Sequence, residues 1–97
     1  MTGDIGEAAI GPASIPRVAR GFRLQWEPVQ DAHVLLYPEG MVKLNGSAGE
    51  ILSRCDGVKS VGTLVGELEQ RFGQEGLERD VLAFLDIARK QRWVEIA

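Results

Sequence analysis

The chain has 97 residues, a net charge of −3, one cysteine and one histidine. A chain of this length forms one domain, and its composition of 44% hydrophobic and 26% charged residues is that of a folded protein. The negative charge argues against nucleic-acid binding, which needs a basic surface. Because Cys55 and His33 stand alone, the sequence excludes an internal disulfide and argues against a zinc site.

The N-terminal residues do not predict an export signal. Asp4 and Glu7 occupy a region where a signal peptide has a basic stretch followed by an apolar run. No apolar run anywhere in the chain approaches the roughly 18 residues of a membrane span. We therefore expect a cytoplasmic protein.

The first segment, residues 1–14, is rich in Gly and Ala and has no sustained hydrophobic period. We expect a flexible N-terminal arm there, followed by a folded domain over residues 15–97. The domain begins with a linking segment from Ile15 to Gly21, in which the proline after Ile15 favours extended backbone.

Three strands are predicted next. Phe22 to Glu27 alternates apolar and polar residues without a fault, which is typical of a strand with one wet face. Asp31 to Tyr37 is apolar on both faces and fits a central strand, and Gly40 to Leu44 alternates again. Short turns containing Pro28 and Pro38 join the three strands. The pattern therefore predicts an antiparallel meander whose first and third strands are edges.

Three helices follow the strands. Ser47 and Glu50 have the spacing of a capping box at the start of a first helix over about residues 48–55. Gly57 is expected to end this helix in a left-handed conformation. Ser60 is expected to cap a second helix that ends at Phe72 before Gly73.

The third helix is predicted from about Leu77 to Arg92 and is apolar over a wider arc than one packing face needs. Leu82 and Ile87 lie on opposite flanks of its core stripe. The residues of this stripe are Leu77, Val81, Phe84, Leu85 and Ala88. Residues 93–96 form a short extended tail. The expected fold is α+β, with a three-stranded antiparallel sheet followed by a three-helix bundle.

No group of residues predicts catalysis. Cys55 lies on the inner face of a helix end, where a small buried hydrophobic residue is favoured over a reactive thiol. His33 lies in a strand, and no Ser or Cys nucleophile has a recognisable motif around it. The chain has no phosphate-binding loop and no cluster of metal ligands in its sequence. We therefore expect no enzyme activity.

The third strand offers a means of binding. An edge strand has unpaired N–H and C=O groups that another chain can complete as an added strand. Over Gly40 to Leu44, Lys43 is the one charged residue that would disfavour pairing of this edge with another strand. If the third helix packs beside this strand, the two elements border a groove for an extended peptide. Such binding should tolerate Lys43→Ala but not Val42→Pro, which removes a ladder donor.

The order of five short motifs resembles that of a known family. The motifs are RGFRL (Arg20–Leu24), LLYPEG (Leu35–Gly40), KLNGSAGEIL (Lys43–Leu52), CDG (Cys55–Gly57) and DVLAFL (Asp80–Leu85). Together they closely resemble the PqqD family of pyrroloquinoline quinone (PQQ) biosynthesis, over about Pro16 to Ile96. Each motif is weak by itself, whereas their order and spacing are specific.

The resemblance implies a winged-helix-like fold and a non-catalytic peptide chaperone, a RiPP recognition element without a cofactor. Members of the family bind the ribosomal precursor peptide and present it to a radical S-adenosylmethionine (SAM) enzyme. The peptide adds as a strand beside the third strand and against the third helix. The residues implied for peptide binding are Met41, Val42, Lys43, Leu44, Leu82, Ala83 and Ile87. The candidate contacts to acidic groups of a partner are Arg79, Arg89 and Lys90.

Two alternatives stay open at this point. The second and third helices also resemble the helix-turn-helix of a winged-helix DNA-binding regulator, although Glu78, Asp80 and Asp86 make the third helix less basic than such a protein needs. Homodimerisation through an open sheet edge is a further option. The pattern also leaves open which flank of the third helix faces the groove.

Overall fold

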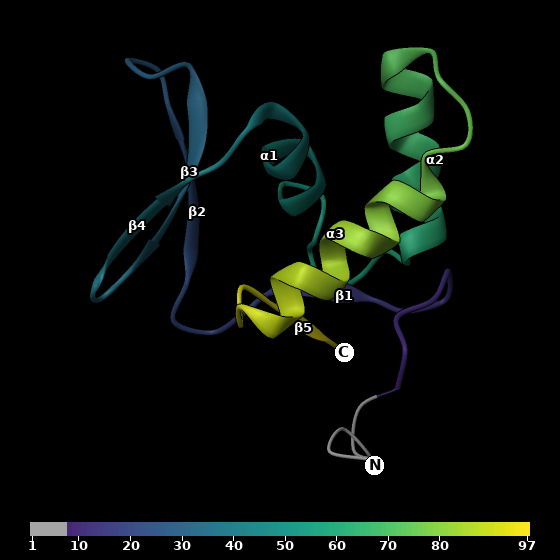
Figure 1. The fold of residues 1–97 in the computed structure, drawn as a ribbon, viewed down its shortest axis with the longest axis horizontal. Helices are drawn as coiled ribbons and strands as arrows, with labels where there is room; N and C mark the ends of the chain where they lie inside the picture. Colours follow the sequence, from purple (N-terminus) through teal and green to yellow (C-terminus); the bar gives the residue numbers. More distant parts are fainter. Residues whose placement is uncertain (1–7) are drawn as a thin grey trace.

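The computed structural model describes residues 8–97. Its elements are, in chain order, β1 (Pro16–Val18), β2 (Arg23–Glu27), β3 (Ala32–Tyr37), β4 (Gly40–Lys43), α1 (Gly46–Leu52), α2 (Val61–Phe72), α3 (Glu78–Lys90) and β5 (Val94–Ile96). The sheet formed by β2, β3 and β4 lies to one side, and α1 lies between it and α2 (Figure 1). The predicted α+β class, a three-stranded antiparallel sheet followed by three helices, is confirmed.

The central strand is β3, with β2 and β4 antiparallel on either side of it. Val34 and Leu35 point to opposite faces of this strand and are 1% and 0% exposed. The prediction that β3 is covered on both faces is therefore confirmed. A tight turn through Pro38 and Glu39 joins β3 to β4, so that Tyr37 pairs directly with Gly40.

The predicted capping box at the start of α1 is wrong. The N-cap is Asn45, whose side-chain oxygen accepts a hydrogen bond from the Ala48 N–H at 2.8 Å. The Glu50 carboxylate instead accepts from Arg54 Nη1 at 2.8 Å and lies 3.3 Å from Arg71 Nε. The hydrogen bond from Arg54 lowers the pKa of Glu50. The cap therefore starts the helix two residues earlier than expected.

The end of α1 also differs from the prediction. The helix stops at Leu52, and Cys55 lies in the turn that follows. Gly57 has a positive φ of 76°, but it belongs to a separate turn. There the Asp56 carboxylate accepts hydrogen bonds from the N–H groups of Val58 and Lys59, which lower the pKa of Asp56.

The predicted ends of α2 are confirmed. The Ser60 hydroxyl accepts from the Thr63 N–H at 3.2 Å, and Gly73 caps the C-terminus in the left-handed conformation. Helix α3 is shorter than the predicted range of residues 77–92. It ends at Lys90 because Arg92 takes a positive φ of 67°, which a helix does not continue.

A second, two-stranded sheet was not predicted. The expected linking segment contains β1, and the expected tail is β5; the two pair antiparallel from Pro16 opposite Ile96 to Val18 opposite Val94. The Arg17 and Glu95 side chains form an ion pair of 2.9 Å across this sheet. This pairing brings the two ends of the described chain together and places them beside α3 (Figure 1).

Residues immediately before β1 cap the N-terminus of α2. The carbonyls of Pro12 and Ser14 accept hydrogen bonds of 2.8 Å from the N–H groups of Gly62 and Val61. Such N–H groups have no partner within a helix, so the segment satisfies donors that would otherwise need water. The expected arm also includes residues 1–7, which lie outside the described residues, and a domain boundary after Ser14 remains a prediction.

The core joins all the major elements. Leu35 of β3, Leu52 of α1, Leu64 of α2 and Leu85 of α3 are each at most 1% exposed. The sheet meets the helices where α1 packs on β3. At this contact a Cβ added to Gly49 would lie 2.6 Å from Nδ1 of His33. The absence of a side chain at Gly49 therefore sets how closely the two elements approach.

Two glycine substitutions test this contact. Gly49→Ala should destabilise the fold, because overpacking costs about 1–3 kcal/mol and exceeds the gain in helix propensity. Gly66→Ala in α2 meets nothing within 4 Å and should stabilise by about 1 kcal/mol. Urea denaturation followed by tryptophan fluorescence measures both. Equal stabilisation by the two substitutions would contradict the close approach of α1 to β3.

Candidate functional site

One side of β4 is open. Among residues 8–97, β4 pairs with β3 and with no other strand. The Leu44 N–H donates to the His33 carbonyl at 3.0 Å, so these two residues are a hydrogen-bonded pair. Such pairs alternate along an antiparallel ladder, so Val42 also bonds to β3. The main-chain N–H and C=O groups of Met41 and Lys43 therefore point away from β3, towards the open edge.

The four residues predicted on this strand divide by side-chain direction. Met41 is 52% exposed and Lys43 is exposed, whereas Val42 is half-buried and Leu44 is 5% exposed. The side chains of Leu44 and Val42 pack against the core. Met41 and Lys43 have exposed side chains, and their main-chain groups form the open edge. The Val42 N–H belongs to the ladder with β3, so Val42→Pro would remove a donor of the sheet itself, whereas Lys43 is a position whose N–H faces the open edge.

The two flanks of α3 have different surroundings. Phe84 and Asp80 border a cavity of about 350 Å³ whose facing wall includes Ser47 and Glu50 of α1. Ile87 follows Phe84 by three residues, so it lies on the same flank, and it is 54% exposed. Helix α1 and the sheet lie on one side of α3, whereas β1 and β5 lie on the other (Figure 1). The flank with Phe84 and Ile87 therefore faces the sheet.

The three helix residues implied for peptide binding are separated by this arrangement. Ile87 lies on the flank that faces the sheet, and Ala83 is exposed one turn before it. Leu82 lies on the other flank and is partly buried against the core. Phe84 was assigned to the core stripe and was missed as a residue of the exposed flank. The signal in the sequence was the spacing of three residues between Phe84 and Ile87, which places both side chains on the same flank of a helix.

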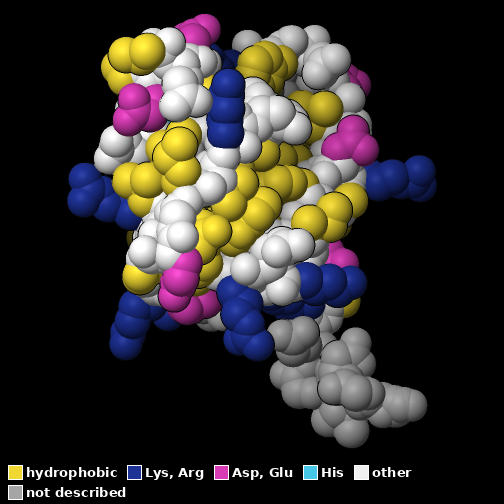
Figure 2. Space-filling view, turned by 60° about the vertical axis from the view of Figure 1, so that its left-hand side comes forward, with side chains coloured by type: hydrophobic (Ala, Val, Ile, Leu, Met, Phe, Trp, Pro, Cys, Tyr) yellow, Lys and Arg dark blue, Asp and Glu magenta, His cyan; other side chains and the backbone are white. Residues whose placement is uncertain are grey.

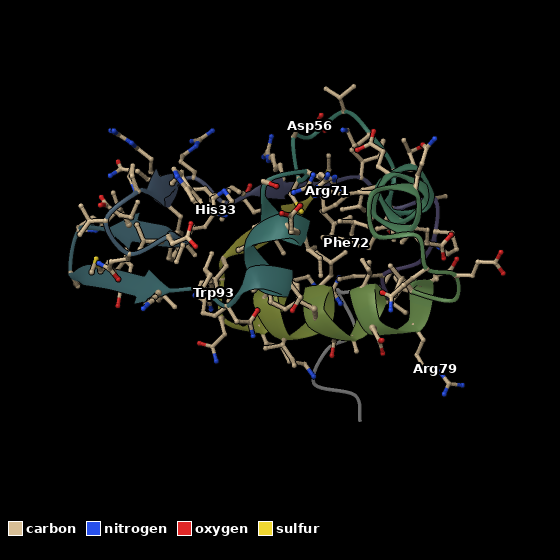
Figure 3. The ribbon with its side chains drawn as sticks, turned by 90° about the horizontal axis from the view of Figure 1, so that it is seen from above. His33, Asp56, Arg71, Phe72, Arg79 and Trp93 are labelled. Atoms are coloured by element: carbon tan, nitrogen blue, oxygen red, sulfur yellow. The ribbon has the colours of Figure 1, made fainter. Side chains whose placement is uncertain are left out.

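The surface between sheet and helices is apolar. Hydrophobic side chains gather across the middle of the face in Figure 2, with Lys and Arg side chains along its lower edge. Met41 and Ile87 are the large, well-exposed hydrophobic residues that β4 and α3 contribute. Seen from above, β4 lies on the same side of the molecule as α3 (Figure 3). An open strand edge and an apolar helix flank thus lie on the same side of the molecule. We call this surface the groove.

The candidate basic contacts do not form one patch. Arg79 extends from the N-terminal part of α3, away from the sheet (Figure 3). Lys90 forms an ion pair of 3.0 Å with Asp86. Arg89 lies on the flank opposite Ile87, and its Nη1 donates to the Ala8 carbonyl at 2.9 Å. These three side chains therefore lie in different places and do not form a common contact surface.

Cys55 and His33 both have structural contacts. Cys55 is 6% exposed, its thiol donates to the Ile51 carbonyl at 3.3 Å, and burial raises its pKa to about 12. The His33 ring packs edge-on against Trp26 at 5.0 Å between centroids and lies below Gly49. Both residues therefore hold elements together at positions where the sequence indicated no chemistry.

Within residues 8–97 no three side chains of His, Cys, Asp or Glu come together as a metal site. The helices of the same range include none that is both long and apolar enough to cross a membrane. The geometry that stands out is the groove.

The comparisons with known proteins define the class of this winged-helix-like module. Residues 32–94 match the family model of coenzyme PQQ synthesis protein D (PqqD). The chain belongs to the PqqD family, and the resemblance seen in its motifs is confirmed.

Curated relatives and a solved structure agree with this assignment. The PqqA binding protein of Azotobacter vinelandii is 55% identical over 83 residues, which cover 84% of this chain and 90% of the relative. That of Pseudomonas aeruginosa is 56% identical over 84 residues, covering 86% and 91%. The solution NMR structure of the PqqD truncation of Methylobacterium extorquens PqqCD, a stand-alone RiPP recognition element, has a TM-score of 0.76 at 31% identity. The matched region covers 90% of this chain and 95% of the solved chain.

The buried thiol leads to a prediction about reactivity. Because the pKa of Cys55 is raised to about 12, almost none of the thiol is ionised at pH 8, and the thiolate is the reactive form. We expect native protein to react with iodoacetamide far more slowly than protein in urea, as followed by mass spectrometry. Rapid alkylation of the native protein would show that the thiol is accessible and not a core residue.

Proposed function

We propose that this protein binds the ribosomal precursor peptide of PQQ biosynthesis as an added strand on β4, beside the Phe84 and Ile87 flank of α3. The observation that carries the proposal is the open edge, where the main-chain groups of Met41 and Lys43 have no strand partner among the described residues. Relatives at about 55% identity are named PqqA binding proteins, which supports this ligand.

Strand addition suits the chemistry of this edge. Two residues whose N–H and C=O groups point outwards supply as many as four main-chain hydrogen bonds to an antiparallel peptide strand. Apolar peptide side chains on the inner face gain burial against Ile87 and Phe84. The main-chain hydrogen bonds thus provide affinity that does not depend on the sequence of the peptide. The apolar flank of α3 provides selectivity for peptides with apolar side chains.

The proposal extends to delivery of the peptide. A module that holds a peptide by its main chain leaves the side chains on the outer face accessible to a second protein. The bound peptide is then presented to the radical SAM enzyme that modifies it. In this scheme the chain needs neither a cofactor nor a catalytic residue of its own, and the chemistry belongs to the enzyme.

No observation favours the alternative of a DNA-binding regulator. The first turn of α3 carries Glu78 and Asp80, and Asp86 pairs with Lys90 further along the helix. A recognition helix that enters a DNA groove needs a basic, unpaired surface. Peptide binding therefore remains the function that this surface supports best.

A proline in β4 tests strand addition directly. Lys43→Pro removes an N–H that faces the open edge and leaves the ladder with β3 intact. We expect the affinity for the precursor peptide to fall about tenfold, which corresponds to roughly one lost hydrogen bond. Isothermal titration calorimetry with the synthetic peptide measures this change.

The matched control is Lys43→Ala, which removes the same side chain and keeps the N–H. It should bind the peptide nearly as tightly as the parent. Light scattering at the working concentration establishes the oligomeric state, since a dimer paired through β4 would compete with the peptide. If Lys43→Pro folds and binds like Lys43→Ala, the peptide does not add to β4.

A second substitution tests which flank of α3 contacts the peptide. Ile87→Ser removes an exposed apolar side chain from the flank that faces the sheet. We expect five- to tenfold weaker peptide binding, corresponding to about 1 kcal/mol of lost apolar burial. Val58→Ser is the control, because Val58 is 78% exposed in the turn before α2. An equal, small effect of both changes would place the peptide elsewhere.

A further inference from the structure

A pocket of about 660 Å³ lies on the side of α3 opposite the groove. Its wall includes residues from the segment before β1, from the turn after β1, from the last turn of α3 and from β5. Three arginines line it, namely Arg20, Arg89 and Arg92. We call it the arginine pocket. These residues are far apart in sequence, and the pairing of β1 with β5 brings them together.

The charges around this pocket are unbalanced. Of the described residues that line it, Glu95 alone is acidic. Its carboxylate already accepts from Arg17 at 2.9 Å and from the Arg20 N–H at 3.4 Å, and the hydrogen bond from Arg17 lowers the pKa of Glu95. Among residues 8–97, Arg20 and Arg92 form no ion pair. Guanidinium groups gathered in this way repel each other unless an anion lies between them.

Arg89 is the most enclosed of the three. Its side chain is 18% exposed, Nη1 donates to the Ala8 carbonyl, and Nη2 lies 3.9 Å from Asp86 Oδ1. Its Nε is sealed from solvent and has no acceptor among the described residues. A buried donor without a partner costs free energy, which a small movement of the Arg89 side chain towards an acceptor in the pocket would recover.

Arg92 occupies a position that favours glycine. Its φ of 67° lies in the left-handed region, which costs an L-residue free energy that glycine does not lose. An arginine at this position is therefore not explained by the backbone. Its side chain lines the pocket, where a guanidinium matches the geometry of an oxyanion.

We propose that the arginine pocket is a binding site for an oxyanion, a carboxylate or phosphate group held by Arg20, Arg89 and Arg92. The ligand is either a free small anion or an acidic side chain of a second protein, since both present the same chemistry. The site is independent of the groove, because the two surfaces lie on opposite flanks of α3. A bound peptide therefore leaves it open.

NMR of the full chain tests the proposal through the arginine Nε–H signals. The probes are inorganic phosphate, acetate and a blocked triglutamate peptide, each added at constant ionic strength. We expect a saturable shift of the Arg89 signal. Arg92→Gly and Arg20→Gln should each weaken binding about tenfold, as expected for a lost hydrogen bond to a charged group.

The variants separate binding from folding. Arg92→Gly relieves the positive φ, so it should fold at least as stably as the parent while losing affinity. Arg23→Gln is the control, because Arg23 is exposed on β2 outside the pocket. Saturation by phosphate or acetate would assign the site to a free anion, and saturation by triglutamate alone to a protein side chain. Absence of saturation with all three probes, or equal shifts in every variant, would overturn the proposal.

Discussion

The packing of α1 on β3 controls the position of the groove. It joins the three-stranded sheet to the helices, and Gly49 permits an approach that any side chain would block at His33. Asn45 starts α1 directly after β4, so strand and helix have little freedom relative to each other. The open edge of β4 is therefore held in one place relative to α3. A surface shared by two elements can recognise an extended chain only if the two elements are held in fixed positions.

The groove combines two kinds of interaction that have different sequence requirements. Main-chain groups of Met41 and Lys43 are available whatever side chains these positions carry, because every residue except proline has the same donor and acceptor. The flank with Phe84 and Ile87 depends on side-chain size and polarity. A module of this design can keep its mode of binding while its selectivity changes through few positions on α3.

Helix α3 separates two surfaces of opposite character. One flank is apolar and faces the sheet, whereas the other carries Arg89 and borders a pocket with three guanidinium groups. The pairing of β1 with β5 is what completes the second surface, since it places Arg20 and Arg92 near the end of α3. Both ends of the folded chain thus contribute to a feature that neither end could form alone.

The sequence by itself determined the local features. Period-two alternation located β2 and β4, and a run that is apolar on both faces located β3. Ser60 and Gly73 marked both ends of α2 correctly, because these signals act over a few residues. At α1 two local signals competed, and the Asn45 cap prevailed while Glu50 paired with arginines. The order of the motifs, taken over most of the chain, identified the family.

Only the tertiary structure decided the rest. The β1–β5 pairing joins residues about eighty positions apart, and no local pattern encodes such a partner. Which N–H groups of β4 face outwards depends on the register with β3, because a shift of one residue exchanges Val42 with its neighbours. The flank of α3 that faces the sheet depends on how the helix is rotated against α1. Each of these is a relation between distant segments, and hydrophobic periodicity describes each segment by itself.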